Sequence, residues 1–356
     1  MKLSLFINNI SNNRLLQLGL LTVVVCLFLN PWIFGGSKAL LIAGKICVFI
    51  LLVASYDLLI GYTGIISFAH TIFFAMGAYG VAMAVQSFGP SWYALSFGAI
   101  AALLASAIAA FLLGVVSFRV KRIFFAMITL AIASVFAIFI NQNYGVTGGE
   151  DGLRIKLPAP LTPSYKLFDE KVFGVRISGK LVSFYLIFTC TFLMLLAMLR
   201  ITKSPFGRIL KAIRENEFRT NALGYTSNFY VISILVMSAC FATVAGIMLA
   251  ILNRYINTDT TVSIQVMIDI LLMVVIGGMG TIYGAVFGVA LVIVAQNYIP
   301  SLLGFATSAT VDTPFAVMFE HERWLFWLGM IFILSVYFLP QGIAGRLKGK
   351  RISNMK

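Results

Sequence analysis

Apolar runs of about 20 residues recur along this chain from end to end, and a run of that length can cross a bilayer as an α-helix. Only 11% of the residues are charged, whereas soluble domains average about 25%, so the apolar surface needs lipid around it. The chain is therefore predicted to be an all-α integral membrane protein with about ten transmembrane helices. The expected segments are 15–34, 39–60, 66–86, 91–116, 123–140, 181–200, 228–251, 264–276, 284–299 and 323–340.

The distribution of Lys and Arg indicates which ends of these helices face the cytoplasm, because positively charged loops resist translocation. With the N-terminus inside, the inner pieces hold 16 of the 26 basic residues but only Glu215 and Glu217 as acids. An even number of spans places the C-terminus inside as well. The net charge of +14 is then a signal of topology, with basic side chains beside anionic lipid headgroups. Nucleic acid is not an expected partner, since no basic domain carries interleaved exposed aromatic residues.

Two polar segments interrupt the predicted bundle. The outer segment, 141–180, is rich in glycine and proline and is predicted to be a turn-rich loop. The inner segment, 202–227, is predicted to contain a short amphipathic helix, with Ser204 as its N-cap, Pro205 at its first position and Gly224 as its stop. Its apolar positions recur at helical spacing at Phe206, Ile209, Leu210 and Ile213.

An amphipathic helix on a cytoplasmic loop has two interpretations. It can lie on the lipid headgroups with its basic residues outward. It can instead insert into a groove on a cytoplasmic partner protein. The residues alone leave both interpretations open.

The inner segment also resembles a known family, the branched-chain amino-acid permeases of ABC importers. The residues that carry this resemblance are Ser204, Pro205, Phe206, Gly207 and Arg208, then Ala212, Ile213, Arg214 and Glu215, and then Ala222, Leu223 and Gly224.

Further blocks agree in the expected order. They are Gly61 to Tyr79 with Gly64, His70 and Gly77; Thr147 to Leu153; Ile276 to Gly280 with Gly277 and Gly278; and Leu339 to Gly342. The outer loop and the chain length favour the longer, M-type subunit of that family.

The resemblance implies one permease domain over residues 1–356 in a bacterial inner (plasma) membrane, with 141–180 as a periplasmic loop and 202–227 as a cytoplasmic coupling segment gripped by the ATPase. The implied partners are cytoplasmic ATPase subunits, a second permease chain, a periplasmic solute-binding protein and an amino-acid-like solute. The sequence has no Gly-x-x-x-x-Gly-Lys-Ser/Thr loop to cradle nucleotide phosphates. We therefore expect no cofactor and no enzyme activity on this chain, with ATP and Mg²⁺ held by the ATPase.

The glycine-rich blocks have a physical interpretation of their own. Non-helical backbone inside a membrane occurs only where protein or a water-filled cavity surrounds it. The block at Gly61 and Gly64 and the block at Gly277, Gly278 and Gly280 both follow an outside-to-inside span, which suggests an internal duplication with two broken elements around a pathway. Close packing of helices through small residues explains the same glycines equally well.

Ionisable residues inside spans are costly and call for an explanation. Lys45 and Asp269 are expected at similar depth, where they can pair or serve as counter-charges for a zwitterionic solute, and we favour the pair. Asp57 lies near the inner end of its span. His70 is interpreted as a packing histidine rather than a ligand, and two histidines cannot form a metal cluster.

Other functions remain open at this stage. The same family includes permeases for urea and short amides. An ion-coupled secondary transporter is a further alternative, although the spans lack a chain of Asp, Glu and His suited to relaying protons. A membrane enzyme would need a nucleophile beside a base, which the sequence does not suggest.

Overall fold

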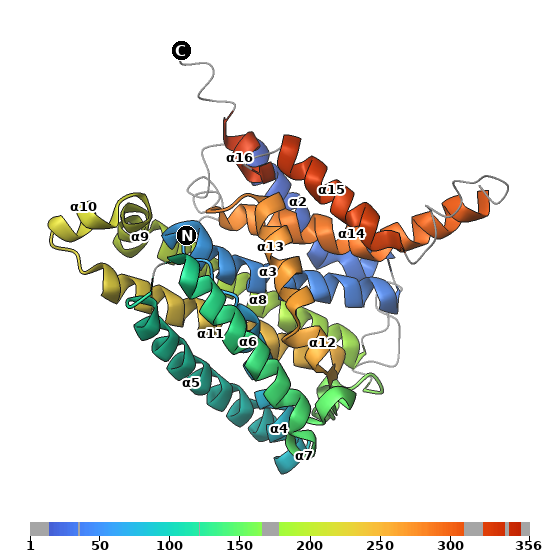
Figure 1. Cartoon of the computed structure of the whole chain (residues 1–356). Helices are drawn as coiled ribbons and strands as arrows, with labels where there is room; N and C mark the ends of the chain where they lie inside the picture. The colour runs from blue at the N-terminus through green and yellow to red at the C-terminus, as the bar shows by residue number, and fades with distance from the viewer. Residues whose placement is uncertain are drawn as a thin grey trace, which may run out of the picture. The chain divides into compact units, whose positions relative to one another are not determined.

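The computed structural model describes residues 14–34, 36–120, 122–165, 178–309, 323–338 and 342–349. Each of the ten predicted apolar segments contains a helix, although the third helix begins at His70 rather than at residue 66 (Figure 1). These helices are α2 (Arg14–Phe34), α3 (Ser37–Thr63), α4 (His70–Phe88), α5 (Trp92–Ser117), α6 (Arg122–Gln142), α8 (Gly179–Lys203), α11 (Ser227–Asn253), α13 (Ile264–Gly277), α14 (Ile282–Ala309) and α15 (Trp324–Phe338).

Short elements connect them: α7 (Tyr144–Thr147), η1 (Gly149–Asp151), β1 (Leu153–Arg154), η2 (Ala159–Leu161), α9 (Pro205–Glu215), α10 (Glu217–Ala222), β2 (Tyr255–Ile256), α12 (Thr258–Thr261) and α16 (Gly342–Gly349). Among the described residues, eight helical segments are long and apolar enough to cross a membrane, and α2 and α15 contribute shorter apolar stretches. The prediction of a helical, multi-pass membrane protein is confirmed.

The chain divides into two compact units. Unit 2 comprises residues 30–271, and unit 1 comprises residues 1–29 and 272–356. The prediction of a single permease domain over residues 1–356 stays a prediction.

The core of unit 2 is built around α3 and α11, most of whose side chains are buried. Helix α11 packs against α3, α4 and α5, and α3 also packs against α8. The α4–α11 contact is close because Gly77 faces the backbone of Thr243 while Gly246 faces the backbone of Phe74, and a Cβ on either glycine would collide with a carbonyl oxygen. Small residues let two helices approach until their backbones touch.

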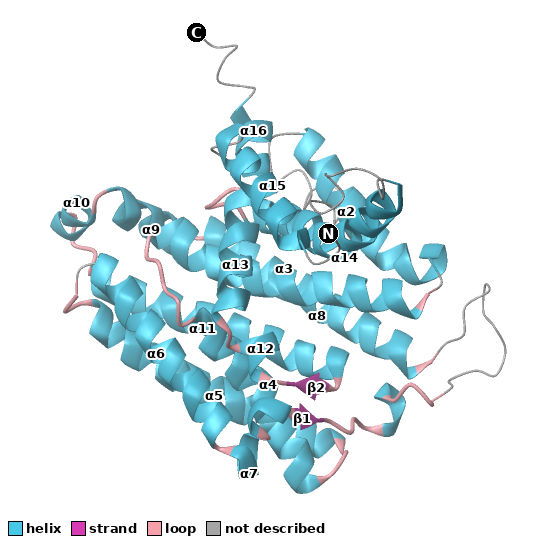
Figure 2. Cartoon of the chain, turned by 45° about the vertical axis from the view of Figure 1, so that its right-hand side comes forward, coloured by secondary structure: helices cyan, strands magenta, loops and turns pink. Residues whose placement is uncertain are grey.

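The two ends of unit 2 differ. One end carries α9 and α10, and the opposite end carries the antiparallel pair β1–β2, as Figure 2 shows. Part of the predicted outer loop is ordered there: Tyr144 donates a hydrogen bond to the carboxylate of Asp151 at 2.8 Å, which raises the pKa of this tyrosine. Residues 166–177 of that loop, and Leu339 to Gln341 of the last block, lie outside the described residues.

In unit 1, α14 packs against α15 and α16. Gly342, the first residue of α16, adopts a φ of 68° and lies against the backbone of Gly278. Gly342, the last residue of the C-terminal block that carries the family resemblance, therefore contacts the second glycine-rich block within this unit.

Candidate functional site

The charged segment after α8 folds as two short helices rather than the one helix predicted. Ser204 caps α9, since its hydroxyl accepts from the Gly207 backbone N–H at 3.4 Å, and Pro205 takes the first position. Asn216 is extended, with φ −157°, and its side chain caps α10 by accepting from Arg219 at 2.9 Å. The break arises because Asn favours caps over helix interiors. Gly224 follows α10 with a φ of 90°, so the stop stands where the sequence placed it.

The apolar face of α9 is used inside the chain itself. Leu210 and Ile213 are each only 1% exposed, and α9 packs against α3, α8 and α11. Phe206 lies 5.5 Å from the Tyr230 ring of α11. An interfacial helix would instead place this face in the lipid. The packing therefore argues against a helix that merely lies on the headgroups.

Two basic residues of α9 hold the end of α3. Arg214 donates a hydrogen bond from its guanidinium to the backbone carbonyl of Gly61. The ammonium of Lys211 lies 5.0 Å from the centroid of the Tyr62 ring, within range for a cation–π interaction. Any displacement of α9 would pull directly on the last turn of α3.

The outward face of this segment, which we call the coupling face, consists of exposed residues of α9, most of them charged, and of exposed apolar residues on α10 and directly after it. Phe218 is 85% exposed and Leu223 is 72% exposed. Exposed apolar residues on a charged element mark a surface for a partner protein. The sequence prediction included Leu223 but missed Phe218, although an aromatic residue between Glu217 and Arg219 was a signal. The α9 members are Arg208, Ala212 and Glu215.

The first glycine-rich block leads into a non-helical segment, Gly64 to Ala69, which we call the first break. Helix α3 ends at Thr63, and Gly64 caps it with a φ of 70° and an N–H that donates to the Ile60 carbonyl at 3.0 Å. The chain then returns along α3, because His70 lies 2.7 Å from the hydroxyl of Ser55. Ser55 precedes the end of α3 by eight residues, or about 12 Å of helix. The first break therefore runs about 12 Å back along the helical bundle.

The backbone of the first break finds partners outside regular structure. The Phe68 N–H donates to the hydroxyl of Thr129 on α6 at 3.0 Å. Next to it lies a cavity of about 300 Å³ between α4, α6, α12 and α13, lined by Phe68 and Thr71 among mostly apolar side chains. Non-helical backbone bordered by protein and a cavity is what a membrane tolerates.

His70 is 1% exposed and forms part of a packed polar cluster. Besides its contact with Ser55, its ring lies 5.2 Å from the Tyr56 ring, centroid to centroid, in an edge-on arrangement. The Ser238 hydroxyl of α11 donates to the Ser55 carbonyl at 2.5 Å. These contacts favour the packing interpretation of this histidine.

The second glycine-rich block forms a tight turn, Gly278 to Thr281, which we call the second break. Gly278 and Gly280 adopt φ 109° and 83°. The Thr281 hydroxyl donates to the Gly278 carbonyl at 3.0 Å, so the turn closes on itself. A Cβ on Gly277 would collide with the carbonyl oxygen of Gly284, which brings the backbones of α13 and α14 into contact.

The three intramembrane charges lie in unit 2. Asp57 is buried in α3, and Asp269 is half-buried in α13. The ammonium of Lys45 lies 5.8 Å from the centroid of the Phe49 ring. The pairing of Lys45 with Asp269 stays a prediction. Within the described part of the chain, no three His, Cys, Asp or Glu side chains are grouped as a metal site would require.

Comparison with known proteins adds a family and several relatives. The model of the family described as "Branched-chain amino acid transport system / permease component" matches residues 39–336. The chain is similar to the high-affinity branched-chain amino acid transport system permease protein LivM of Salmonella typhimurium, with 24% identity over 93% of this chain and 74% of the relative.

Two other relatives cover the chain almost as well. The permease protein BraD of Pseudomonas aeruginosa is 28% identical over 85% of this chain and 93% of the relative. The permease protein LivH of Salmonella typhimurium is 25% identical over 85% of this chain and 92% of the relative. No solved structure matches the chain.

Proposed function

Because the chain belongs to the family of permease components of branched-chain amino acid transport systems, we propose that it is the membrane-spanning subunit of an ATP-driven importer that moves branched-chain or related amino acids inward. Residues 39–336 carry the family match, which includes α9 and α10. The relatives named LivM and BraD transport branched-chain amino acids by name, and this supports the same class of solute here.

The coupling face is the observation that carries the proposal. It combines exposed apolar side chains at Phe218 and Leu223 with a helix whose own apolar face is locked against α3 and α8. If a partner ATPase binds this face and moves when it closes around ATP, it would shift α9. Arg214 would pass that movement to Gly61, directly before the first break.

The remaining partners follow from this assignment. ATP and Mg²⁺ are bound by the ATPase subunits, and this chain supplies no catalytic group. A second permease chain completes the pathway, and similarity to both LivM and LivH relatives supports a related partner chain. We expect a solute-binding protein to dock on the side of the membrane away from α9. With α9 in the cytoplasm and an even number of spans, both termini would lie in the cytoplasm.

The docking of the ATPase can be tested with purified proteins in nanodiscs. Phe218→Ala should weaken ATPase binding about tenfold, since truncating an aromatic anchor at an interface centre costs about 1–2 kcal/mol or more. Phe124→Ala is the matched control, because Phe124 is also an exposed aromatic residue but lies on α6. Equal ATPase affinity in the two variants would exclude the coupling face as the docking site.

The transmission step has its own test. Arg214→Gln should retain ATPase binding but lose most solute uptake in proteoliposomes, because the bond to Gly61 is the link it removes. Reversing the charges of Arg214 and Glu215 together should abolish uptake while the protein still folds. Uptake of leucine that persists without ATPase and collapses with the proton gradient would instead identify a secondary transporter. Competition by leucine, urea and acetamide separates the possible solutes.

A further inference from the structure

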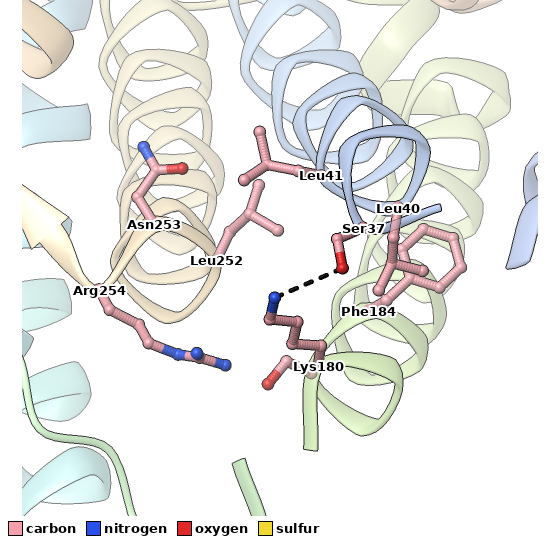
Figure 3. Close-up of a pocket in the computed structure, with 9 residues that line it drawn as sticks. Ser37, Leu40, Leu41, Lys180, Phe184, Leu252, Asn253 and Arg254 are labelled. Atoms are coloured by element: carbon pink, nitrogen blue, oxygen red, sulfur yellow. Dashed lines mark hydrogen bonds between the residues drawn. The ribbon is translucent and has the colours of Figure 1, made fainter. Parts of the chain in front are cut away.

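A second cavity lies at the end of unit 2 opposite the coupling face. It has a volume of about 170 Å³, is open on one side and is bordered by the first turns of α3 and α8 and the last turn of α11 (Figure 3). One water needs only about 10–15 Å³ of such volume, so the cavity has room for a small solute. Because α3 and α8 run from this cavity to α9, a cytoplasmic α9 places the cavity at the outer face. We call it the outer pocket.

Two basic side chains line the outer pocket. Figure 3 shows the ammonium of Lys180 directed toward Ser37 from α8, and the guanidinium of Arg254 extending into the same space from the end of α11. The Lys180 ammonium lies 3.5 Å from the Ser37 hydroxyl. The described lining of the outer pocket contains no Asp or Glu. An anion bound between these two cations would be attracted to both.

Helix ends strengthen the positive potential of the outer pocket. Both Ser37 and Lys180 lie in the first turn of their helices, where the backbone N–H groups carry partial positive charge. These helix ends act together with the two basic side chains, and all of them favour a negatively charged group at the same place.

Arg254 is held in this position at a conformational cost. Its φ of 57° is left-handed, and it is the only described residue other than glycine with a positive φ. It is fixed by three bonds: its N–H donates to Ala250 at 3.0 Å, its carbonyl accepts from Ile155 at 2.9 Å, and its guanidinium donates to Leu161 at 2.7 Å. Its Nε is buried and has no hydrogen-bond partner. Strained backbone of this kind is concentrated at functional sites.

The rest of the outer pocket is suited to an amino acid rather than to a simple ion. Leu41, Phe184 and Leu252 form an apolar wall. The side-chain amide of Asn253 lies on the wall formed by α11 (Figure 3) and offers an oxygen that accepts from an ammonium group. Cationic, neutral accepting and apolar groups are thus all present.

We propose that the outer pocket binds the transported amino acid, with its carboxylate between Lys180 and Arg254, its ammonium at Asn253 and its side chain against Leu41 and Leu252. This inference rests on the proposed importer function and adds a solute site on the permease itself. A phospholipid phosphate could supply the same anionic chemistry from the outer leaflet. The amino acid is favoured because the apolar wall and the amide complement its other two groups.

The experiment measures binding of radiolabelled leucine to the complete permease–ATPase complex in nanodiscs, without the solute-binding protein. Lys180→Gln should weaken leucine binding about tenfold, as expected for loss of a charge-assisted contact, and Lys180→Arg should restore most of it. Arg254→Gln is expected to act in the same direction. Lys38→Gln is the matched control, because Lys38 is an exposed lysine of the same α3 turn that does not line the outer pocket. Isoamylamine, which lacks the carboxylate, should not compete.

Several results would overturn the proposal. One is leucine binding that Lys180→Gln leaves unchanged, and another is effective competition by isoamylamine. A third is a wild-type complex that binds no leucine but retains phosphatidylglycerol in a Lys180-dependent way, which would identify a lipid site. If the assembled wild-type importer moves no branched-chain amino acid on ATP, the importer function itself fails. If that importer is active and only the binding results fail, the outer pocket alone is wrong.

Discussion

The two glycine-rich breaks look alike in the sequence and are built differently. The first break, Gly64 to Ala69, is a non-helical segment whose backbone N–H at Phe68 donates to the hydroxyl of Thr129 and which borders a cavity. The second break, Gly278 to Thr281, is a closed turn that presses α13 and α14 together. In the first break Gly64 supplies a left-handed backbone conformation, whereas the second block adds close approach to such conformations, because Gly277 lets α13 meet the backbone of α14. The same residue type therefore marks a candidate moving part in one unit and a fixed joint in the other.

The largest effect is expected at the fixed joint. Gly277→Val should destabilise the protein by about 3 kcal/mol, because the added side chain meets the Gly284 carbonyl and neither backbone can yield. Thermal unfolding in detergent micelles measures this. Gly304→Val, where a Cβ meets nothing within 4 Å on α14, is the control. If both variants unfold at the same temperature, the second break is not a packed joint.

A smaller loss is expected where the first break is anchored. Thr129→Val removes the acceptor of the Phe68 N–H and should cost about 2 kcal/mol, the penalty for a buried donor left without a partner. Thr129→Ser keeps the hydroxyl and should behave like the wild type. Hydrogen exchange at Phe68 reports the change directly. Equal protection of this amide in the Val and Ser variants would mean that another group or water satisfies it.

The smallest effect is expected at the turn into the first break. Gly64→Ala should cost about 1 kcal/mol, because φ 70° is unfavourable for a residue with a Cβ. Gly64→Asn should cost less, since Asn tolerates the left-handed region better. The unfolding midpoint of the two variants gives the difference. A loss for Ala as large as that of Gly277→Val would show that the first break is also a packed joint, and the contrast would disappear.

Much of the fold could be predicted from the sequence because membrane helices obey a local rule. A run such as 39–60 must satisfy its backbone internally, so it forms a helix whatever its neighbours are. The helix start at Ser204 and Pro205 could also be predicted, because a cap depends only on neighbouring residues. The break at Asn216 was missed because the free energies of placing Asn at an N-cap and inside a helix differ by only a small amount.

Contacts between distant segments were beyond the reach of sequence reasoning. Nothing in the pattern of α9 states that Arg214 meets Gly61, or that Leu210 and Ile213 are covered by the chain itself. Phe218 was overlooked because its exposure, and not its identity, makes it a candidate contact. The outer pocket joins residues of α3, α8 and α11 that are far apart in the sequence.

The sequence by itself therefore determined that the chain lies in a membrane, which segments form helices and which family the chain resembles. Apolar run length and cap residues depend on hydration and on backbone hydrogen bonding within about 20 residues. Only the tertiary structure decided that one glycine block borders a cavity while the other closes a joint, and that Lys180 and Arg254 line one pocket. Those outcomes depend on which side chains and backbones meet across the bundle, and that information is not local to any segment.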